Sequence, residues 1–311
     1  MLVLEHYLKI GNKIFPGVND VVIESTRESI SDICTIDLPK YRKLQPSDVK
    51  QGDVVIFRAG YRQYGLQDEF HGVVSEVTPT QPLTVKAEDY FYYLRDIVST
   101  TYKKMYAGDI VKQLCQGTSI DTSRVQQGIF ITYKPYQNVS KRFIVQDLAK
   151  RCGFDAHMLG KYLIFNKPFA DMGSKIPVFK YGLNIIDERL TFRTDCDYDR
   201  VVVISEQTDG SGKIFKGVAG SGKKTLTVYL DNLGKDTAIE RAKEIYDEIS
   251  YMGFTGDFTT FGYPSVHHSS VIKVEDERFP QKNGNYQVDK LTKKYGGGGY
   301  RQEITLGKKV A

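Results

Sequence analysis

The sequence has no tryptophan, only four cysteines in 311 residues, and no apolar run near the about 18 residues that a membrane-spanning helix needs. Its first residues, MLVLEHYLKIGNK, are too polar for a secretory signal. The cysteines form no C-x-x-C pair, which favours buried, reduced thiols over a zinc site or a disulfide framework: Cys34, Cys115, Cys152 and Cys196. We therefore expect a chain that is made and folded in the cytoplasm, without a membrane partner.

An excess of charge of one sign is also lacking. The chain has 43 Lys and Arg against 38 Asp and Glu, a net charge of +5, and the two signs are interspersed throughout. A nucleic-acid-binding protein usually gathers its basic residues into a patch or stripe. No specific nucleic-acid partner is therefore expected. The 41% hydrophobic content and the length predict a folded chain of about two or three domains.

Aromatic residues are abundant, with 21 tyrosines and 16 phenylalanines, and many lie in runs that alternate apolar and polar positions. Such alternation is typical of half-buried strands. Residues 1–95 contain six such runs separated by turn residues, which predicts a small β-barrel or sandwich, and residues 255–311 return to the same pattern. The expected fold is mainly β, with two β-barrel domains.

Between these regions the pattern changes to helical spacing. Residues 96–182 read as an α/β insertion, with one helix ending near Gly117, a second ending at Gly153, and then a hairpin. Residues 183–254 read as mixed β with one helix that leads into the second barrel. A Thr237-x-x-Glu240 capping box is predicted to start this helix, with four residues on its buried face: Ile239, Ala242, Tyr246 and Ile249.

The stretch FKGVAGSGKKTLTVYL matches most of the phosphate-binding pattern G-x-x-x-x-G-K-[ST], through Gly217, Gly222 and Lys223. However, Lys224 stands where the magnesium-binding hydroxyl should be. The residues after it alternate like a strand, whereas a phosphate loop needs a helix there. The pattern thus favours a turn between two strands. A nucleotide-binding enzyme that uses the 217–225 loop stays as an alternative.

A second pattern resembles a calcium loop: Asp195, Asp197, Asp199 and Glu206 fill positions 1, 3, 5 and 12 of an EF-hand. Arg200 occupies position 6, where the sharp turn requires glycine, and a strand follows instead of a helix. We interpret the aspartates as one solvated face of a strand. No metal and no cofactor are predicted.

Catalytic motifs are similarly weak. There is no G-x-S-x-G nucleophile elbow, and the rings of adjacent His267 and His268 would point to opposite faces of a strand. Paired carboxylates remain open as an alternative, since their approach depends on tertiary structure. The chain is predicted not to be an enzyme.

The segment KKYGGGGYRQ joins two alternating runs and is predicted to be a hairpin tip. It reads either as a loose surface turn or as an adaptable contact loop that a partner orders. The residues concerned are Tyr295, Gly296, Gly297, Gly298, Gly299 and Tyr300.

The order of three segments resembles the phage tail baseplate hub proteins, the late control protein D family, and the hub portion of the type VI secretion spike protein VgrG. The first segment is ITYKPYQNVSKRFIVQDLAKRCGFDAHMLGKYLIF, and the second is NIIDERLTFRTDCDYDRVVVIS. The third runs from FTTFGYPSVHHSS to the final YRQEITLG. The similarity spans nearly the whole chain, and it rests on the order of the three segments.

The resemblance implies two related β-barrels per subunit and a homotrimer whose ring of six barrels adapts a six-fold tail tube to a three-fold spike. The expected partners are further copies of the chain, the tube protein, a separate spike protein and baseplate proteins, in a virion tail assembled in the host bacterial cytoplasm. Lys223, Lys224 and the 295–300 segment are then candidate contact loops. A tail-associated cell-wall hydrolase is a further alternative.

Overall fold

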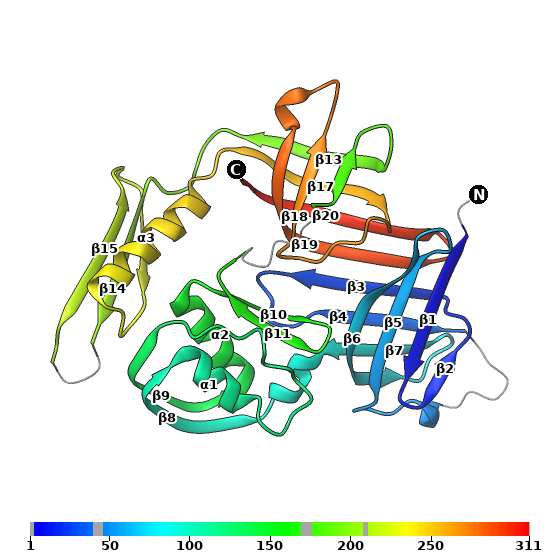
Figure 1. Cartoon of the computed structure of the whole chain (residues 1–311), viewed down its shortest axis with the longest axis horizontal. Helices are drawn as coiled ribbons and strands as arrows, with labels where there is room; N and C mark the ends of the chain where they lie inside the picture. Colours follow the sequence, from blue (N-terminus) through cyan, green and yellow to red (C-terminus); the bar gives the residue numbers. More distant parts are fainter. Residues whose placement is uncertain (1–2, 40–45, 169–175, 208–210, 311) are drawn as a thin grey trace.

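The computed structural model describes residues 3–39, 46–168, 176–207 and 211–310 (Figure 1). Strands dominate, and short helices occur in the middle of the chain, so the predicted mainly β fold with small α/β elements is confirmed. The elements fall into four packing units, each with its own apolar core. The proposed domain boundaries at 95/96, 182/183 and 254/255 remain predictions.

The N-terminal β unit contains seven strands, whose alternating burial reflects the alternating sequence. Its elements are β1 (Leu4–Ile10), β2 (Lys13–Phe15), β3 (Asp20–Thr26), β4 (Ile33–Leu38), the 3₁₀ helix η1 (Pro46–Asp48), β5 (Val54–Tyr61), β6 (Gly65–Thr78), β7 (Leu83–Asp89) and the 3₁₀ helix η2 (Tyr90–Leu94). The inward residues of these strands are buried, and Leu8, Ile36 and Phe57 are each at most 1% exposed.

The C-terminal β unit is built from later strands, seen in orange, red and green at the top of Figure 1. Its elements are β12 (Val178–Lys180), β13 (Ile185–Arg193), β17 (Gly253–Phe261), β18 (Val271–Glu275), the 3₁₀ helix η3 (Pro280–Lys282), β19 (Gly284–Gly296) and β20 (Gly299–Val310). Its core is separate from that of the N-terminal β unit and centres on Phe179, Phe258 and Tyr286.

One sheet runs through both β units. Its strand order is β13-β17-β20-β19-β3-β4-β7-β6-β5-β1-β2, with β18 also paired to β19 and β12 paired to β18. The two units meet where Lys290–Gly296 of β19 pairs antiparallel with Asp20–Thr26 of β3. Backbone hydrogen bonds therefore fix the two units relative to each other.

The two β units repeat one topology. The order β3-β4-β7-β6-β5-β1 in the first corresponds to β13-β17-β20-β19-β18-β12 in the second. The repeat extends to irregular details, because β6 shifts register against β7 between Val74 and Glu76, and β19 shifts against β20 between Val288 and Lys290. The units differ in one ladder: β1 pairs antiparallel with β5, whereas β12 pairs parallel with β18.

The backbone around the two register shifts is also the same. The amide of Val74 donates to the carbonyl of Asp53 (2.8 Å), and the carbonyl of Val74 accepts from Gly52 (2.9 Å). In the second unit, Val288 makes the same two bonds to the chain segment before β18, at 2.9 Å each. The bulges are thus equivalent positions, and they align the two units residue by residue.

The α/β insertion packs below the sheet in Figure 1. It contains β8 (Ile97–Tyr106), α1 (Ala107–Leu114), β9 (Phe130–Ser140), α2 (Lys141–Cys152), β10 (Asp155–Leu159) and β11 (Tyr162–Asn166). The helix predicted to stop at Gly153 does so, with that glycine in the left-handed region at φ 68° and the Ser140 hydroxyl accepting from the Phe143 amide at the other end (3.3 Å).

The last unit is a three-stranded sheet covered on one face by a helix; we call it the helix-covered sheet. It consists of β14 (Arg200–Glu206), β15 (Ile214–Gly220), β16 (Thr225–Tyr229) and α3 (Lys235–Ile249), with β14 in the centre. The predicted capping box is wrong, because α3 starts earlier, after Gly234, and no side chain caps it. Three of the four residues predicted for its buried face are confirmed, because Ala242 is fully buried and Tyr246 and Ile249 pack against the core. Ile239 is instead 42% exposed, and Ala238 is buried.

Three of the four cysteines are buried free thiols, as predicted. Cys196 differs, because it lies partly exposed in the connection between β13 and β14. In the part of the chain that the structure describes, no helix is long and apolar enough to cross a membrane.

Candidate functional site

The loop with the phosphate-loop pattern crosses over the start of β14. β15 pairs antiparallel with one edge of β14 and β16 pairs parallel with the other, so residues 221–224 connect the two edges. The Lys224 carbonyl accepts the Asp199 amide (2.8 Å), and the Gly222 amide lies 3.5 Å from the Asp199 carbonyl. The prediction of a turn between two strands is confirmed, and a strand stands where a phosphate loop requires its helix.

Packing explains why this stretch is rich in glycine. A β-carbon at Gly222 would lie 1.9 Å from the β-carbon of Asp199, and one at Gly217 would lie 1.9 Å from the Ala238 carbonyl oxygen of α3. Close approach therefore requires both glycines. Lys223 and Lys224 are left exposed on the loop.

Asp195, Asp197 and Asp199 were predicted to share one solvated face of a strand, and this prediction is wrong. Asp195, Asp197 and Asp199 lie in the connection between β13 and β14. Asp197 pairs with Arg193 (3.5 Å), and Asp199 accepts the Lys224 amide (3.4 Å). Across the described ranges, the His, Cys, Asp and Glu side chains form no group of three that could hold a metal ion.

The glycine-rich hairpin tip divides into an inner and an outer part. Tyr295 and Tyr300 face each other across the β19–β20 ladder and are 8% and 1% exposed, packed within the core of the N-terminal β unit. The Tyr61 hydroxyl donates to the Tyr300 carbonyl (3.1 Å). The two rings are thus engaged within the chain. A β-carbon at Gly297 or Gly298 would meet open space, so these residues form the outer tip.

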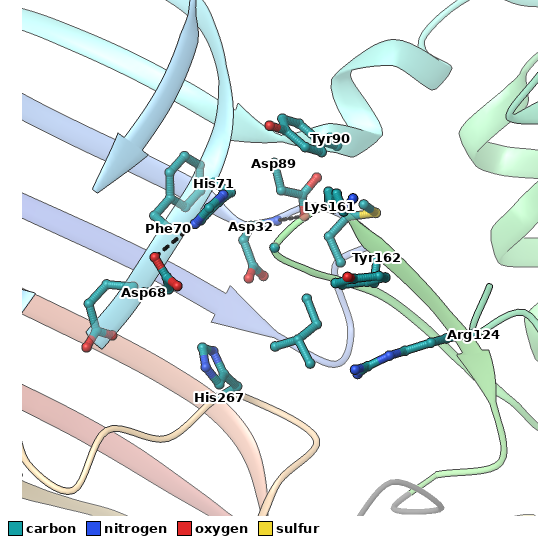
Figure 2. Close-up of a pocket in the computed structure, with 14 residues that line it drawn as sticks. Asp32, Asp68, Phe70, His71, Asp89, Tyr90, Arg124, Lys161, Tyr162 and His267 are labelled. Atoms are coloured by element: carbon teal, nitrogen blue, oxygen red, sulfur yellow. Dashed lines mark hydrogen bonds and ion pairs between the residues drawn. The ribbon is translucent and has the colours of Figure 1, made fainter. Parts of the chain in front are cut away.

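A cavity of about 430 Å³ lies where three units meet (Figure 2). Asp32 and Asp89 line it from the N-terminal β unit, Arg124 and Tyr162 from the α/β insertion, and His267 from the loop before β18. The predicted strand setting for His267 and His268 is wrong, because both lie in that loop. The ring of His268 lies 4.8 Å from that of His157 in β10, and its Nδ1 lies 3.8 Å from the Asp32 carboxylate.

The acidic groups of this cavity are engaged with internal donors. The Asp89 carboxylate accepts from the Ser31 hydroxyl and from the amides of Asp32 and Phe91, each at 2.9 Å. It thereby caps η2. Asp68 accepts from Arg58 (2.6 Å) and contacts the ring of His71 (3.2 Å). The bonds of Asp89 fix the end of β7 to the turn before β4, and the Arg58–Asp68 pair lies across the β5–β6 ladder, so both have a structural task.

Burial shifts the proton affinities in this region. It raises the pKa of Asp89 to about 7, against the hydrogen bonds from Asp32 and Phe91 that favour the ionised form. Burial and the Asp89 carboxylate together raise the pKa of Asp32 well above its usual range. Burial and the charge of Lys293 lower the pKa of His267 to about 4, and burial with neighbouring imidazoles lowers the pKa of His268 well below its usual range. The histidines are neutral at pH 7.

The sequence alone did not predict that the residues around this cavity lie close together. Asp32, Asp89 and His157 lie in ordinary strand and turn sequences that carry no motif. The His267-His268 pair was visible in the sequence, but its neighbours come from strands more than a hundred residues away.

No protein-family model matches this sequence, and a search of curated proteins also found no match. Solved structures do match. The 43 kDa tail protein of prophage MuSo2 from Shewanella oneidensis aligns over 98% of both chains, with a TM-score of 0.74 and 15% identity. A tail protein from Neisseria meningitidis aligns over 98% of this chain and 97% of its own, with a TM-score of 0.74 and 13% identity.

The chain has the fold of phage tail proteins. The same fold extends to a type VI secretion component from E. coli, itself described as similar to tail proteins of bacteriophage T4. That protein aligns over 98% of this chain and 79% of its own, with a TM-score of 0.63 and 10% identity. The fold expected from the order of the three sequence segments is therefore confirmed.

Proposed function

We propose that this chain is a structural subunit of a phage tail or a related contractile injection particle. In this role three copies form a hub that joins the tail tube to a separate trimeric spike, with baseplate proteins at its rim. The match to tail proteins over nearly the whole length of both chains supports this assignment, since it covers all four packing units. The place of action would be the virion tail.

The observation that carries the hub role is the duplicated β unit within one continuous sheet. Three copies of a chain with two equivalent β units supply six equivalent units, the number needed to meet a six-fold tube on one side. The three chains provide three-fold symmetry for a spike on the other side. Symmetry matching of this kind needs no catalytic group.

Two exposed loops are candidate contacts with tail partners. Lys223 and Lys224 project from the crossover loop, and Gly297 and Gly298 form the outer tip of the β19–β20 hairpin. Replacing both lysines with alanine is expected to weaken capture of a tail partner while leaving the fold intact, because both side chains are exposed.

Light scattering of the purified chain tests the proposal. The expected mass is three times 35.3 kDa, and negative-stain images should show rings with six similar lobes. Co-purification with the tube and spike proteins of the same particle is the second expected result. A chain that stays monomeric at tens of micromolar, both alone and with those proteins, would contradict the hub role.

A further inference from the structure

The contact between the two β units inside the chain is an antiparallel ladder between β3 and β19. In its register Leu291 lies opposite Ser25, and Lys290 lies opposite Thr26. The ladder uses the edge of β19 that lies beyond the bulge at Asp289, where pairing with β18 has ended. One β unit thus joins the next through a specific strand pair.

The duplication assigns a counterpart to each strand of this ladder. β6 corresponds to β19, and the equivalent bulges place Glu76 at the position of Lys290 and Val77 at that of Leu291. β13 corresponds to β3, and the strand registers place Phe192 at the position of Ser25.

The match between β13 and β3 follows from the residues that lie opposite one another in three successive ladders of each β unit. From Leu291, the directly opposed residues are Ile304, Phe258 and then Glu188. From Val77, they are Val85, Ile36 and then Val21. Val21 and Glu188 are therefore equivalent. Four residues further along each strand lie Ser25 and Phe192, and Thr26 and Arg193 follow them.

Both counterpart edges are open in the described structure. β13 is the last strand of the sheet, and among the described residues the edge that faces away from β17 has no ladder, with only an isolated bridge from Ile185 to Tyr181 at the start of the strand. In β6, pairing with β5 ends at Val73, and the described structure shows no ladder for the same edge over residues 76–78. An exposed strand edge is a template for pairing with another chain.

The side chains on the two edges are complementary. Phe192 is 57% exposed, and its ring packs edge-to-face on that of Phe254 with 5.1 Å between the ring centroids. Val77 is partly buried, and Glu76 is exposed beside it. The duplicated register would place Phe192 opposite Val77 and Arg193 opposite Glu76. An apolar pair and an opposite-charge pair directly across a ladder are both stabilising.

We propose that β13 of one copy pairs antiparallel with residues 76–78 of β6 in a second copy, with Phe192 opposite Val77 and Arg193 opposite Glu76. This interface repeats between chains the contact that β3 and β19 make within one. It joins two different surfaces, so it closes into a ring only after a fixed number of copies. The proposal rests on the hub role, and it adds the residues that would hold the ring together.

Disulfide trapping tests the register. In a Cys196→Ser background, a chain carrying both Val77→Cys and Phe192→Cys is expected to form covalent trimers under mild oxidation, because directly opposed residues lie within disulfide reach. Mixing the two single variants should give covalent dimers. A matched control combines Phe192→Cys with Ile14→Cys, which is 63% exposed on the strand at the far end of the sheet, and should give no product.

Charge reversal tests the same register without cysteine. Arg193→Glu and Glu76→Arg should each weaken self-association by about tenfold, because like charges would face each other in every interface of the ring. The double variant should recover most of that loss. Far-UV circular dichroism of each variant checks that the fold is unchanged, which matters because Arg193 also contacts Asp197.

The hub role and the β13–β6 pairing are contradicted by different results. A stable trimer without cross-linking and without a charge-reversal effect would overturn this strand pairing and leave the hub role standing. A chain that remains monomeric with its tail partners, and that forms no covalent product, would overturn both.

Discussion

Lys293 in β19 forms an ion pair with Glu69 in β6 at the junction of the two β units, and the two side chains are only 3% and 0% exposed. The Ser265 hydroxyl, in the loop after β17, joins both groups: it donates to Glu69 (3.0 Å) and accepts from Lys293 (2.8 Å). A charged network thus connects the two β units beyond their shared strand ladder.

Removing one partner of this pair should strongly destabilise the chain. Lys293→Met leaves the Glu69 carboxylate buried without its cation and is expected to cost about 3–5 kcal/mol of unfolding free energy. The neighbouring Lys294→Met is the matched control, because that side chain is exposed. Urea denaturation measures both. The double variant Lys293→Met/Glu69→Leu should recover most of the loss, and equal effects of the two lysine variants would contradict the network's role.

Arg151 holds the α/β insertion to the helix-covered sheet. Its guanidinium donates to the Asp147 carboxylate on α2 (2.7 Å) and to both the carboxylate and the carbonyl of Asp231 (2.7 Å each). Arg151→Met should cost about 3 kcal/mol, since two carboxylates lose a buried partner. The adjacent, exposed Lys150→Met should change stability by less than about 0.5 kcal/mol. Hydrogen exchange should report faster opening around Asp231 in the first variant alone.

Gly217 sets the distance between β15 and α3. Gly217→Ala places a β-carbon 1.9 Å from the Ala238 carbonyl oxygen, so α3 must shift, and we expect a loss of about 1–3 kcal/mol. Gly298→Ala is the control because nothing lies within 4 Å of its added β-carbon. Thermal unfolding compares them. An unchanged midpoint for Gly217→Ala would show that α3 is not packed as described.

Acidification should lower the stability of the fold through His267, which lines the cavity where three units meet. The pKa of His267 is lowered to about 4 in the folded chain. As the pH falls from about 6.5 towards 4, the unfolded chain therefore binds more protons at this residue than the folded chain does. Stability contributed by this group is therefore lost over that window, by up to about 3 kcal/mol. The raised pKa of Asp89, about 7, acts in the opposite direction, because protonation below pH 7 favours the folded chain.

Variants separate the two opposing effects. His267→Asn/His268→Gln should lose less stability than the wild type between pH 6.5 and pH 4. Asp89→Asn should lack the stabilisation that the wild type gains as the pH falls below 7. Denaturation at several pH values measures both, and parallel pH profiles for all three proteins would refute the assignment.

The sequence by itself determined the local structure wherever one feature dominated. Alternating apolar residues set the strands of both β units, and the helix from Lys141 to Cys152 ends at Gly153 because a left-handed residue follows it. The predicted start of α3 was wrong: Thr237 offered a capping pattern, whereas the helix begins after Gly234 and Ala238, one turn inside it, lies against Gly217 of β15.

Only the tertiary structure decided the strand registers and which distant residues are buried together. Alternation indicates which residues of a strand share a face, but the registers that align β6 with β19 and β3 with β13 come from backbone pairing between distant segments. The same holds for Tyr295 and Tyr300, which were predicted beside an adaptable loop and instead fill the core of the other β unit. Burial of Asp32, Asp89 and His268 likewise depends on three units meeting, and no local pattern encodes such a meeting.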